Sequence, residues 1–144
     1  MLEKNEELAD VFEDVGNSLQ FLGEAWVKVR SYLNISEVLR ELDEPIETIV
    51  AEGRLERVDG VGKAISKKVR EYLEKGTFPL LERLDDQIPE DVREMLRGGL
   101  APSVTRESIK LGYETLESLN EAIDSGELTE SSFPSKHRAR FRNY

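Results

Sequence analysis

The sequence contains no cysteine, a single histidine and no long hydrophobic run. Without cysteine the chain can form neither a disulfide framework nor a thiolate zinc site, and it has no cysteine nucleophile. Apolar runs of only a few residues exclude a membrane span, and the acidic N-terminus is not that of a signal peptide. We therefore expect a soluble, cytoplasmic protein. Its 144 residues are enough for one domain or two small ones, but not for a large catalytic domain.

Sustained alternation of apolar and polar residues is also missing, so the sequence predicts an all-α protein. Asn5 is predicted to cap a first helix that ends near Gly23. Other helices are expected to begin and end at prolines, glycines and capping residues. They cover about residues 26–42, 46–52, 63–75, 79–84, 90–97, 103–111 and 116–125. Trp26 is expected to pack in the core, whereas Tyr32 can pack there or stack on an exposed base or sugar.

The polar segment 85–89 ends in proline and is predicted to separate two units. The first unit covers residues 1–84 and the second covers residues 88–144. Each contains a short helix, a glycine turn and a second helix in the same order. We therefore expect two small helical units, each built around a helical hairpin, in a monomeric chain.

The first glycine turn lies within residues 58–69, between an apolar lead-in and a helix that opens with lysines. Gly60 and Gly62 are expected to adopt backbone angles closed to other residues, so that N–H groups around Val61 and the helix N-terminus point at one anionic oxygen. Three lysines add positive charge beside the turn: Lys63, Lys67 and Lys68. The pattern is typical of a helix-hairpin-helix element that binds DNA phosphates without reading bases. The alternative is an ordinary tight turn between helices.

The second glycine turn contains Gly99, Leu100 and Ala101, and Ser103 and Arg106 follow it on the next helix. Ala101 stands where a glycine would allow the closest approach of a ligand to the backbone. This turn is therefore a degenerate copy of the first. Two readings stay open for it: a second phosphate grip, or a purely structural hairpin.

The formal charge of −10 argues against a protein that coats DNA electrostatically. The charge is segregated, however. Residues 1–24 carry one lysine against seven carboxylates, whereas residues 54–75 carry seven basic and four acidic side chains. The sequence predicts a local basic face on an acidic body. Residues 136–144 form a basic tail, which we interpret as a phosphate-contacting arm, a solvated tail or the point where a longer natural chain was cut.

Several stretches are similar to the amino-terminal part of X-family DNA polymerases, the relatives of DNA polymerase beta. They are residues 5–12, 27–32, 58–76 and 96–119, and the first hairpin is the most specific of them. The resemblance implies a DNA polymerase beta N-terminal domain-like (SAM domain-like) fold. It also implies a lyase-type domain that holds the 5′-phosphate side of a gap and a thumb or fingers domain that holds the duplex.

The same resemblance implies a candidate chemistry. Lys68 occupies the position of the lysine that attacks the aldehyde of an abasic sugar in lyase-active relatives, and Lys28 and Tyr32 match positions that hold the phosphate and the sugar. Neighbouring cations favour the unprotonated amine that such an attack needs. Two departures weaken the inference: Ala64 replaces a phosphate-binding lysine, and Lys67 replaces a glutamate. The alternative for Lys68 is a solvated lysine on a basic helix face.

The metal-binding polymerase palm of that family has no counterpart in this sequence, so we do not expect this chain alone to polymerise DNA. Asp85 and Asp86 are adjacent carboxylates of the kind usually found on solvated surfaces, and we predict no metal site there. The single histidine, His137, is expected at the surface. No cofactor is required, although the resemblance allows Na⁺ or K⁺ at the hairpin carbonyls.

Three hypotheses follow. The leading one is a DNA-repair module that binds gapped, nicked or 5′-phosphate DNA ends by their backbone, with DNA and possible repair proteins as partners. The second is an enzyme, a 5′-deoxyribose-phosphate or abasic-site lyase that uses Lys68. The third is a helical domain that has lost DNA binding and serves protein association, for which the net charge is the main support.

Overall fold

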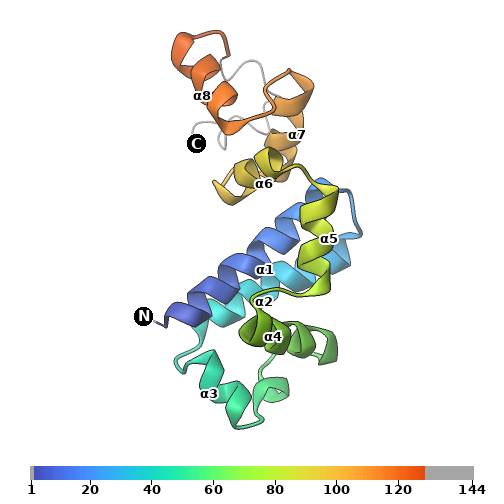
Figure 1. Ribbon diagram of the computed structural model, residues 1–144, viewed down its shortest axis with the longest axis vertical. Helices are drawn as coiled ribbons and strands as arrows, with labels where there is room; N and C mark the ends of the chain where they lie inside the picture. The colour runs from blue at the N-terminus through green and yellow to red at the C-terminus, as the bar shows by residue number, and fades with distance from the viewer. Residues whose placement is uncertain (1, 129–144) are drawn as a thin grey trace.

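The structure is a computed structural model that describes residues 2–128, and all its regular elements are helical. This confirms the predicted all-α class. The elements are α1 Glu3–Phe21, α2 Trp26–Glu41, α3 Ile46–Ala51, the short 3₁₀ helix η1 Leu55–Arg57, α4 Lys63–Lys75, α5 Pro79–Gln87, α6 Glu90–Arg97, α7 Pro102–Lys110 and α8 Leu116–Ser125. Figure 1 shows α3, η1 and α4 toward one end of the long axis and α6 to α8 toward the other, with α1 and α2 between them.

The antiparallel pair α1 and α2 forms the scaffold on which the first hairpin lies. Phe12 of α1 is fully buried and stacks on Tyr32 of α2 and on Phe78, with ring centroids 6.1 and 5.7 Å apart. Gly16 lets the two helices approach, since a Cβ there would lie 2.6 Å from Leu33. Apolar burial along this seam is the main source of stability for helices of this length.

The prediction that Asn5 caps the first helix, α1, is wrong. It lies inside the helix, is 2% exposed, and its side-chain oxygen accepts a hydrogen bond of 2.7 Å from the N–H of Ile46. Its amide nitrogen donates to the carbonyl oxygen of Glu44 at 2.8 Å. Asn5 therefore satisfies the first free N–H of α3, a short helix whose own N-cap, Pro45, makes no side-chain bond. This distant contact fixes α3 against the start of α1.

The predicted polar linker at residues 85–89 is wrong in its local structure. Helix α5 continues to Gln87, so Asp85 and Asp86 lie on a helix, and Ile88 is only 1% exposed. Buried apolar residues form two clusters, one from Leu8 to Leu96 and one from Met95 to Leu128. The division into units 1–84 and 88–144 stays a prediction, because Val92 and Leu96 of α6 belong to the first cluster.

Trp26 is not a core residue, contrary to expectation. It begins α2 and is 56% exposed, and Val27 beside it is 81% exposed. Tyr32, one and a half turns later, is only 7% exposed. The helix therefore turns Tyr32 inward and leaves Trp26 at the surface.

None of the helices between residues 2 and 128 combines the length and the hydropathy that crossing a bilayer requires. The predicted basic tail, residues 136–144, and His137 lie outside the described residues.

Candidate nucleic-acid interface

The first hairpin consists of η1, the turn at residues 58–62 and α4. Gly60 has φ of +89°, a left-handed angle that residues with a Cβ rarely adopt. Val61 is 8% exposed and anchors the turn in the core, while its N–H donates to the carbonyl oxygen of Val58 at 3.1 Å. The buried valine and the glycine angle together hold the turn in one shape.

Gly62 differs from the prediction. Its φ of −93° and ψ of −174° describe extended backbone that any residue adopts, so conformational strain does not require glycine here. A Cβ at this position would meet nothing within 4 Å in the described chain. The missing side chain leaves open space directly at the N-terminus of α4.

The N–H groups at the start of α4 have no acceptor within the part of the chain that the structure describes. This holds for Gly62, Lys63 and Ala64, whereas the N–H of Ser66 already bonds to the carbonyl oxygen of Gly62 at 2.9 Å. Free donors at the N-terminus of a 13-residue helix carry a partial positive charge. An anionic oxygen above Gly62 would receive these hydrogen bonds.

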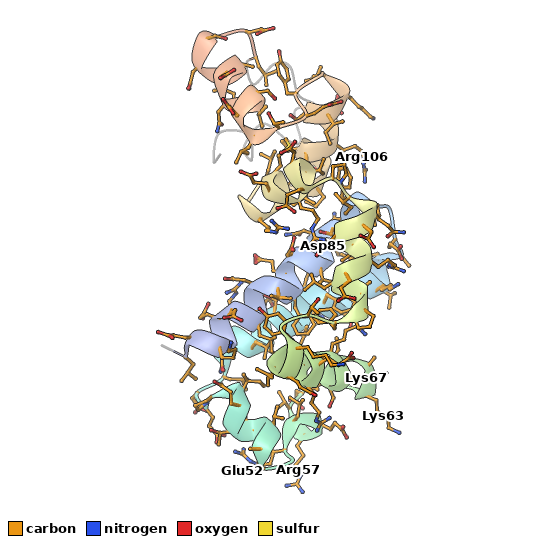
Figure 2. All side chains as sticks on the ribbon, viewed as in Figure 1. Glu52, Arg57, Lys63, Lys67, Asp85 and Arg106 are labelled. Carbon is orange, nitrogen blue, oxygen red and sulfur yellow. The ribbon has the colours of Figure 1, made fainter. Side chains whose placement is uncertain are left out.

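Exposed cations surround this N-terminus. Arg57, Lys63 and Lys67 are exposed, and none has a carboxylate within 4 Å among the described residues. Figure 2 shows Arg57 and Lys63 pointing away from the body of the protein. By contrast, Arg40 and Arg54 are each paired with two or more carboxylates. Three cations without an acidic partner in the described chain therefore lie around the first hairpin.

Lys68 lies behind this exposed edge. Its Nζ is 5.9 Å from the centroid of the Tyr32 ring, and the side chain is half-buried. Desolvation lowers the pKa of Lys68, the nearby Lys28 and Lys67 lower it further, and Glu71 opposes them. The structure therefore brings together Lys28, Tyr32 and Lys68, which the sequence had selected as one site.

The helix-hairpin-helix domain model matches residues 3–78, more than half of the chain. The chain belongs to the helix-hairpin-helix family. No curated protein matches the sequence significantly. Helix-hairpin-helix domains commonly bind DNA, and membership suggests that this chain binds nucleic acid through its backbone.

The sequence did not predict a role for two further residues: Glu24, within the matched domain, and Arg83, just beyond it. Arg83 of α5 lies near Tyr32, and Glu24, between α1 and α2, pairs with Lys28 at 3.3 Å and with Arg83 at 3.9 Å. Burial raises the pKa of Tyr32, and the charges of Lys28 and Arg83 oppose that shift. The Glu24–Lys28 pair has a spacing of four residues, which the sequence could have revealed, whereas Arg83 reaches Glu24 only in the folded chain.

The second hairpin, beyond the family match, is built differently. Gly99 has φ of +94°, but its N–H and that of Leu100 bond to the carbonyl oxygens of Leu96 and Met95, each at 3.2 Å. Pro102 begins α7 and has no N–H to donate. Fewer donors are therefore available at this helix start than at α4.

The side chains of the second hairpin also serve other contacts. Arg106 donates to the carbonyl oxygens of Gln20 and Phe21 at 3.2 and 2.5 Å, and its guanidinium lies over the Phe21 ring. Ala101 is buried, and Ser103 is half-buried. Arg106 thus binds the C-terminal end of α1. A phosphate grip at this turn stays a prediction.

Across residues 2–128 there is no group of three or more histidine, cysteine or acidic side chains placed to hold a metal ion. Of the two adjacent aspartates of α5, Asp85 forms an ion pair with Arg93 at 2.8 Å. The chemistry available at the first hairpin is therefore that of hydrogen-bond donors, cations and one partly desolvated amine.

Proposed function

We propose that this protein binds the DNA backbone without base specificity at gaps, nicks or 5′-phosphate ends, as a module of DNA repair. One observation carries the proposal. The first hairpin combines free N–H groups at the start of α4 with exposed lysines that have no acidic partner in the described chain. Such a surface matches phosphate oxygens and offers nothing that distinguishes one base from another.

The acidic charge of the rest of the protein favours a DNA contact confined to the hairpin over a contact spread across the whole surface. Phosphate neutralisation drives nonspecific binding, and a chain of net charge −10 would repel DNA away from the hairpin. The resemblance to the amino-terminal region of X-family polymerases further supports gapped or 5′-phosphorylated DNA as the substrate. Binding at one phosphate group and its neighbours fits both observations.

The test is binding to two short duplexes of unrelated sequence, measured by fluorescence anisotropy. Replacing Lys63 and Lys67 by glutamine should weaken binding to both duplexes by the same factor. As a control, Lys110→Gln removes one positive charge from an exposed lysine at the end of α7, away from the hairpin, and should have little effect. Equal losses in all variants, or a loss on one sequence only, would contradict phosphate binding at the hairpin.

A second candidate function rests on Lys68. Its half-buried amine has a lowered pKa and lies beside Tyr32 and Lys28. Such an amine can add to the aldehyde carbon of an abasic sugar, lose water and form a Schiff base. This supports the hypothesis of a 5′-deoxyribose-phosphate lyase.

Borohydride reduces the Schiff base to a stable amine and so traps the enzyme on DNA. A gapped duplex that carries a 5′-deoxyribose phosphate should yield a covalent adduct with the wild-type protein and none with Lys68→Ala. Binding without an adduct would leave a DNA-binding module alone.

The expected Na⁺ or K⁺ at the hairpin carbonyls is tested separately, by comparing DNA binding in potassium chloride and in tetramethylammonium chloride of equal ionic strength.

A further inference from the structure

A cleft of about 750 Å³ lies where α1 meets α5, α6 and the second glycine turn. Its lining also includes Tyr72 and Gly76 at the C-terminal end of α4, whereas Lys63 begins that helix at the other end. Figure 2 shows Asp85, one of the lining residues, where α5 approaches α6. Clefts of this volume hold ligands in other proteins. None of the residues that we assign to the DNA contact lines it.

The cleft carries an excess of negative charge. Four carboxylates and two guanidinium groups line it, those of Asp10, Glu13, Asp14, Asp85, Arg93 and Arg97. Both arginines pair with Asp14, while Asp10 and Glu13 share one arginine outside the lining, Arg40, with a third carboxylate. The side chains of Asp10, Glu13 and Asp85 are 72, 48 and 52% exposed. These three carboxylates therefore face solvent and attract cations.

Arg93 gives a second, independent indication of a ligand. It is 1% exposed and lines the cleft, yet its Nε and one terminal nitrogen have no hydrogen-bond acceptor among the described residues. The contact of that terminal nitrogen with Asp85, at 2.8 Å, is poorly aligned for a hydrogen bond. Buried donors in proteins nearly always have an acceptor. An oxygen atom that a ligand brings into the cleft would supply one.

Apolar side chains complete the lining. Leu96 and Leu100 are buried, and Val11 and Leu81 are half-buried. A ligand that matches this lining needs cations, an apolar group and an oxygen acceptor. A peptide segment with arginine or lysine beside an apolar residue has all three, because its main chain supplies carbonyl oxygens. Nucleic acid has the wrong charge for the cleft, and a polyamine has no oxygen acceptor.

We propose that this cleft binds a basic, partly apolar segment of a partner protein. Cationic side chains of the segment pair with Asp10 and Glu13 on α1 and with Asp85 on α5. An apolar side chain packs on the leucines of the lining, and a main-chain carbonyl oxygen accepts a hydrogen bond from Arg93. The inference goes beyond the proposed function and does not depend on it, because the cleft and the hairpin share no residue of the DNA contact.

The experiment uses two short synthetic peptides whose binding to the full chain is measured by fluorescence anisotropy. One alternates arginine with leucine, and the other carries citrulline, a neutral residue of nearly the same shape, in place of each arginine. The arginine peptide should bind and the citrulline peptide should not. Replacing Asp10 by asparagine together with Glu13 by glutamine should weaken binding of the arginine peptide by about fivefold, since exposed ion pairs are individually weak.

A matched control separates the cleft from overall charge. Glu121 and Asp124 are also a glutamate and an aspartate three residues apart, exposed on a helix, α8, that does not line the cleft. The double variant Glu121→Gln, Asp124→Asn therefore makes the same charge change elsewhere. It should bind the arginine peptide like the wild type.

Glycine amide signals in NMR spectra locate the bound peptide. Gly76 and Gly99 line the cleft, whereas Gly53 and Gly60 lie beside the first hairpin. The arginine peptide should shift the signals of Gly76 and Gly99 and leave those of Gly53 and Gly60 in place. Spermidine, a polyamine, should displace the peptide only weakly.

Four outcomes would overturn the inference. They are equal binding of the two peptides, an equal loss of affinity in the α8 control, shifts confined to Gly53 and Gly60, and complete displacement of the peptide by stoichiometric spermidine. Shifts of Gly76 and Gly99 that grow with protein concentration alone would assign the cleft to a second copy of the chain and so also contradict a separate partner. DNA binding by the Lys63→Gln, Lys67→Gln variant tests the proposed function separately.

Discussion

The guanidinium of Arg93 on α6 lies 2.5 Å from the carboxylate of Asp14 on α1. Arg93 is 1% exposed and also lies 2.8 Å from Asp85 in poor hydrogen-bond alignment, while its Nε has no acceptor in the described chain. The buried charge thus depends on Asp14. The pair links the first helix to the helices of the second hairpin.

Asp14→Ala should therefore destabilise the protein by about 3 kcal/mol, because it leaves a buried arginine with one poorly aligned partner. Urea unfolding followed by circular dichroism measures the change. Replacing both residues, in Asp14→Leu with Arg93→Met, should recover most of the loss. A double variant as unstable as Asp14→Ala would show that packing at α6, and not the unpaired charge, is responsible.

The two glycines of the first hairpin should respond differently to alanine. Gly60→Ala should destabilise the fold by about 1 kcal/mol, because its left-handed angle strains a residue with a Cβ. Gly62→Ala should leave stability within about 0.5 kcal/mol, because its backbone is extended and the space is open. Its methyl group would instead project from the donor-rich end of α4, so DNA affinity should fall. Thermal unfolding and DNA titration of both variants check this; unchanged DNA affinity in Gly62→Ala argues against ligand approach at that point.

The hydrogen bond from Tyr72 to Glu7, 2.7 Å long, should give stability a defined pH window. Burial, helped by Glu7, raises the pKa of Tyr72 to about 12, and the same bond lowers the pKa of Glu7. Because the pKa of Tyr72 is higher in the folded than in the unfolded chain, where it is near 10, the protonated tyrosine stabilises the fold below about pH 10. This stabilisation is lost as the pH rises through about 12. Because the pKa of Glu7 is lower in the folded than in the unfolded chain, where it is near 4.5, the ionised carboxylate stabilises the fold above about pH 4.5. This stabilisation is lost as the pH falls further.

Tyr72→Phe should accordingly be less stable than the wild type between about pH 5 and 10, by under about 1 kcal/mol because Glu7 is largely exposed. The difference should shrink toward both extremes. Unfolding curves at pH 3, 7 and 11 provide the measurement. A difference that stays constant with pH would assign the effect to packing of the ring.

Lys68 should titrate below its usual pKa of 10.5, mainly because it is desolvated. Reductive ¹³C-methylation followed by NMR titration reads this value without any assay of activity. Tyr32→Ala opens the surface beside Lys68, so the pKa should move back up. Lys28→Gln should also raise it, by removing a neighbouring positive charge. If Lys68 titrates like a free lysine, the lyase hypothesis loses its chemical support.

Local signals in the sequence predicted most of the helices. Gly76 and Gly126 end α4 and α8 in the left-handed conformation, and Thr115 caps α8 through a reciprocal bond with Ser118. Each of these features depends on residues at most a few positions apart. That is why the order and bounds of the helices were predictable within a few residues.

The errors concern residues whose partners are distant in sequence. Asn5 was predicted to cap its own helix, but its side-chain oxygen accepts a hydrogen bond from the N–H of Ile46 in α3, 41 residues away. The first three residues of the segment that looked like a linker are helical, since Leu84 and Ile88 on either side are buried and Asp85 has a partner in Arg93. At the candidate site, the hairpin lysines were visible in the sequence, whereas the contact of Arg83 with Glu24 forms only in the folded chain.

The central claim is that the first hairpin binds phosphates, and salt dependence tests it most directly. The logarithm of the DNA affinity of the wild type should fall linearly with the logarithm of salt concentration, with a slope of roughly −0.9 for each phosphate contacted in duplex DNA. The Lys63→Gln, Lys67→Gln variant should show a slope shallower by about 1 to 2 units. A wild-type affinity that hardly changes with salt, or an unchanged slope in the variant, would contradict the account.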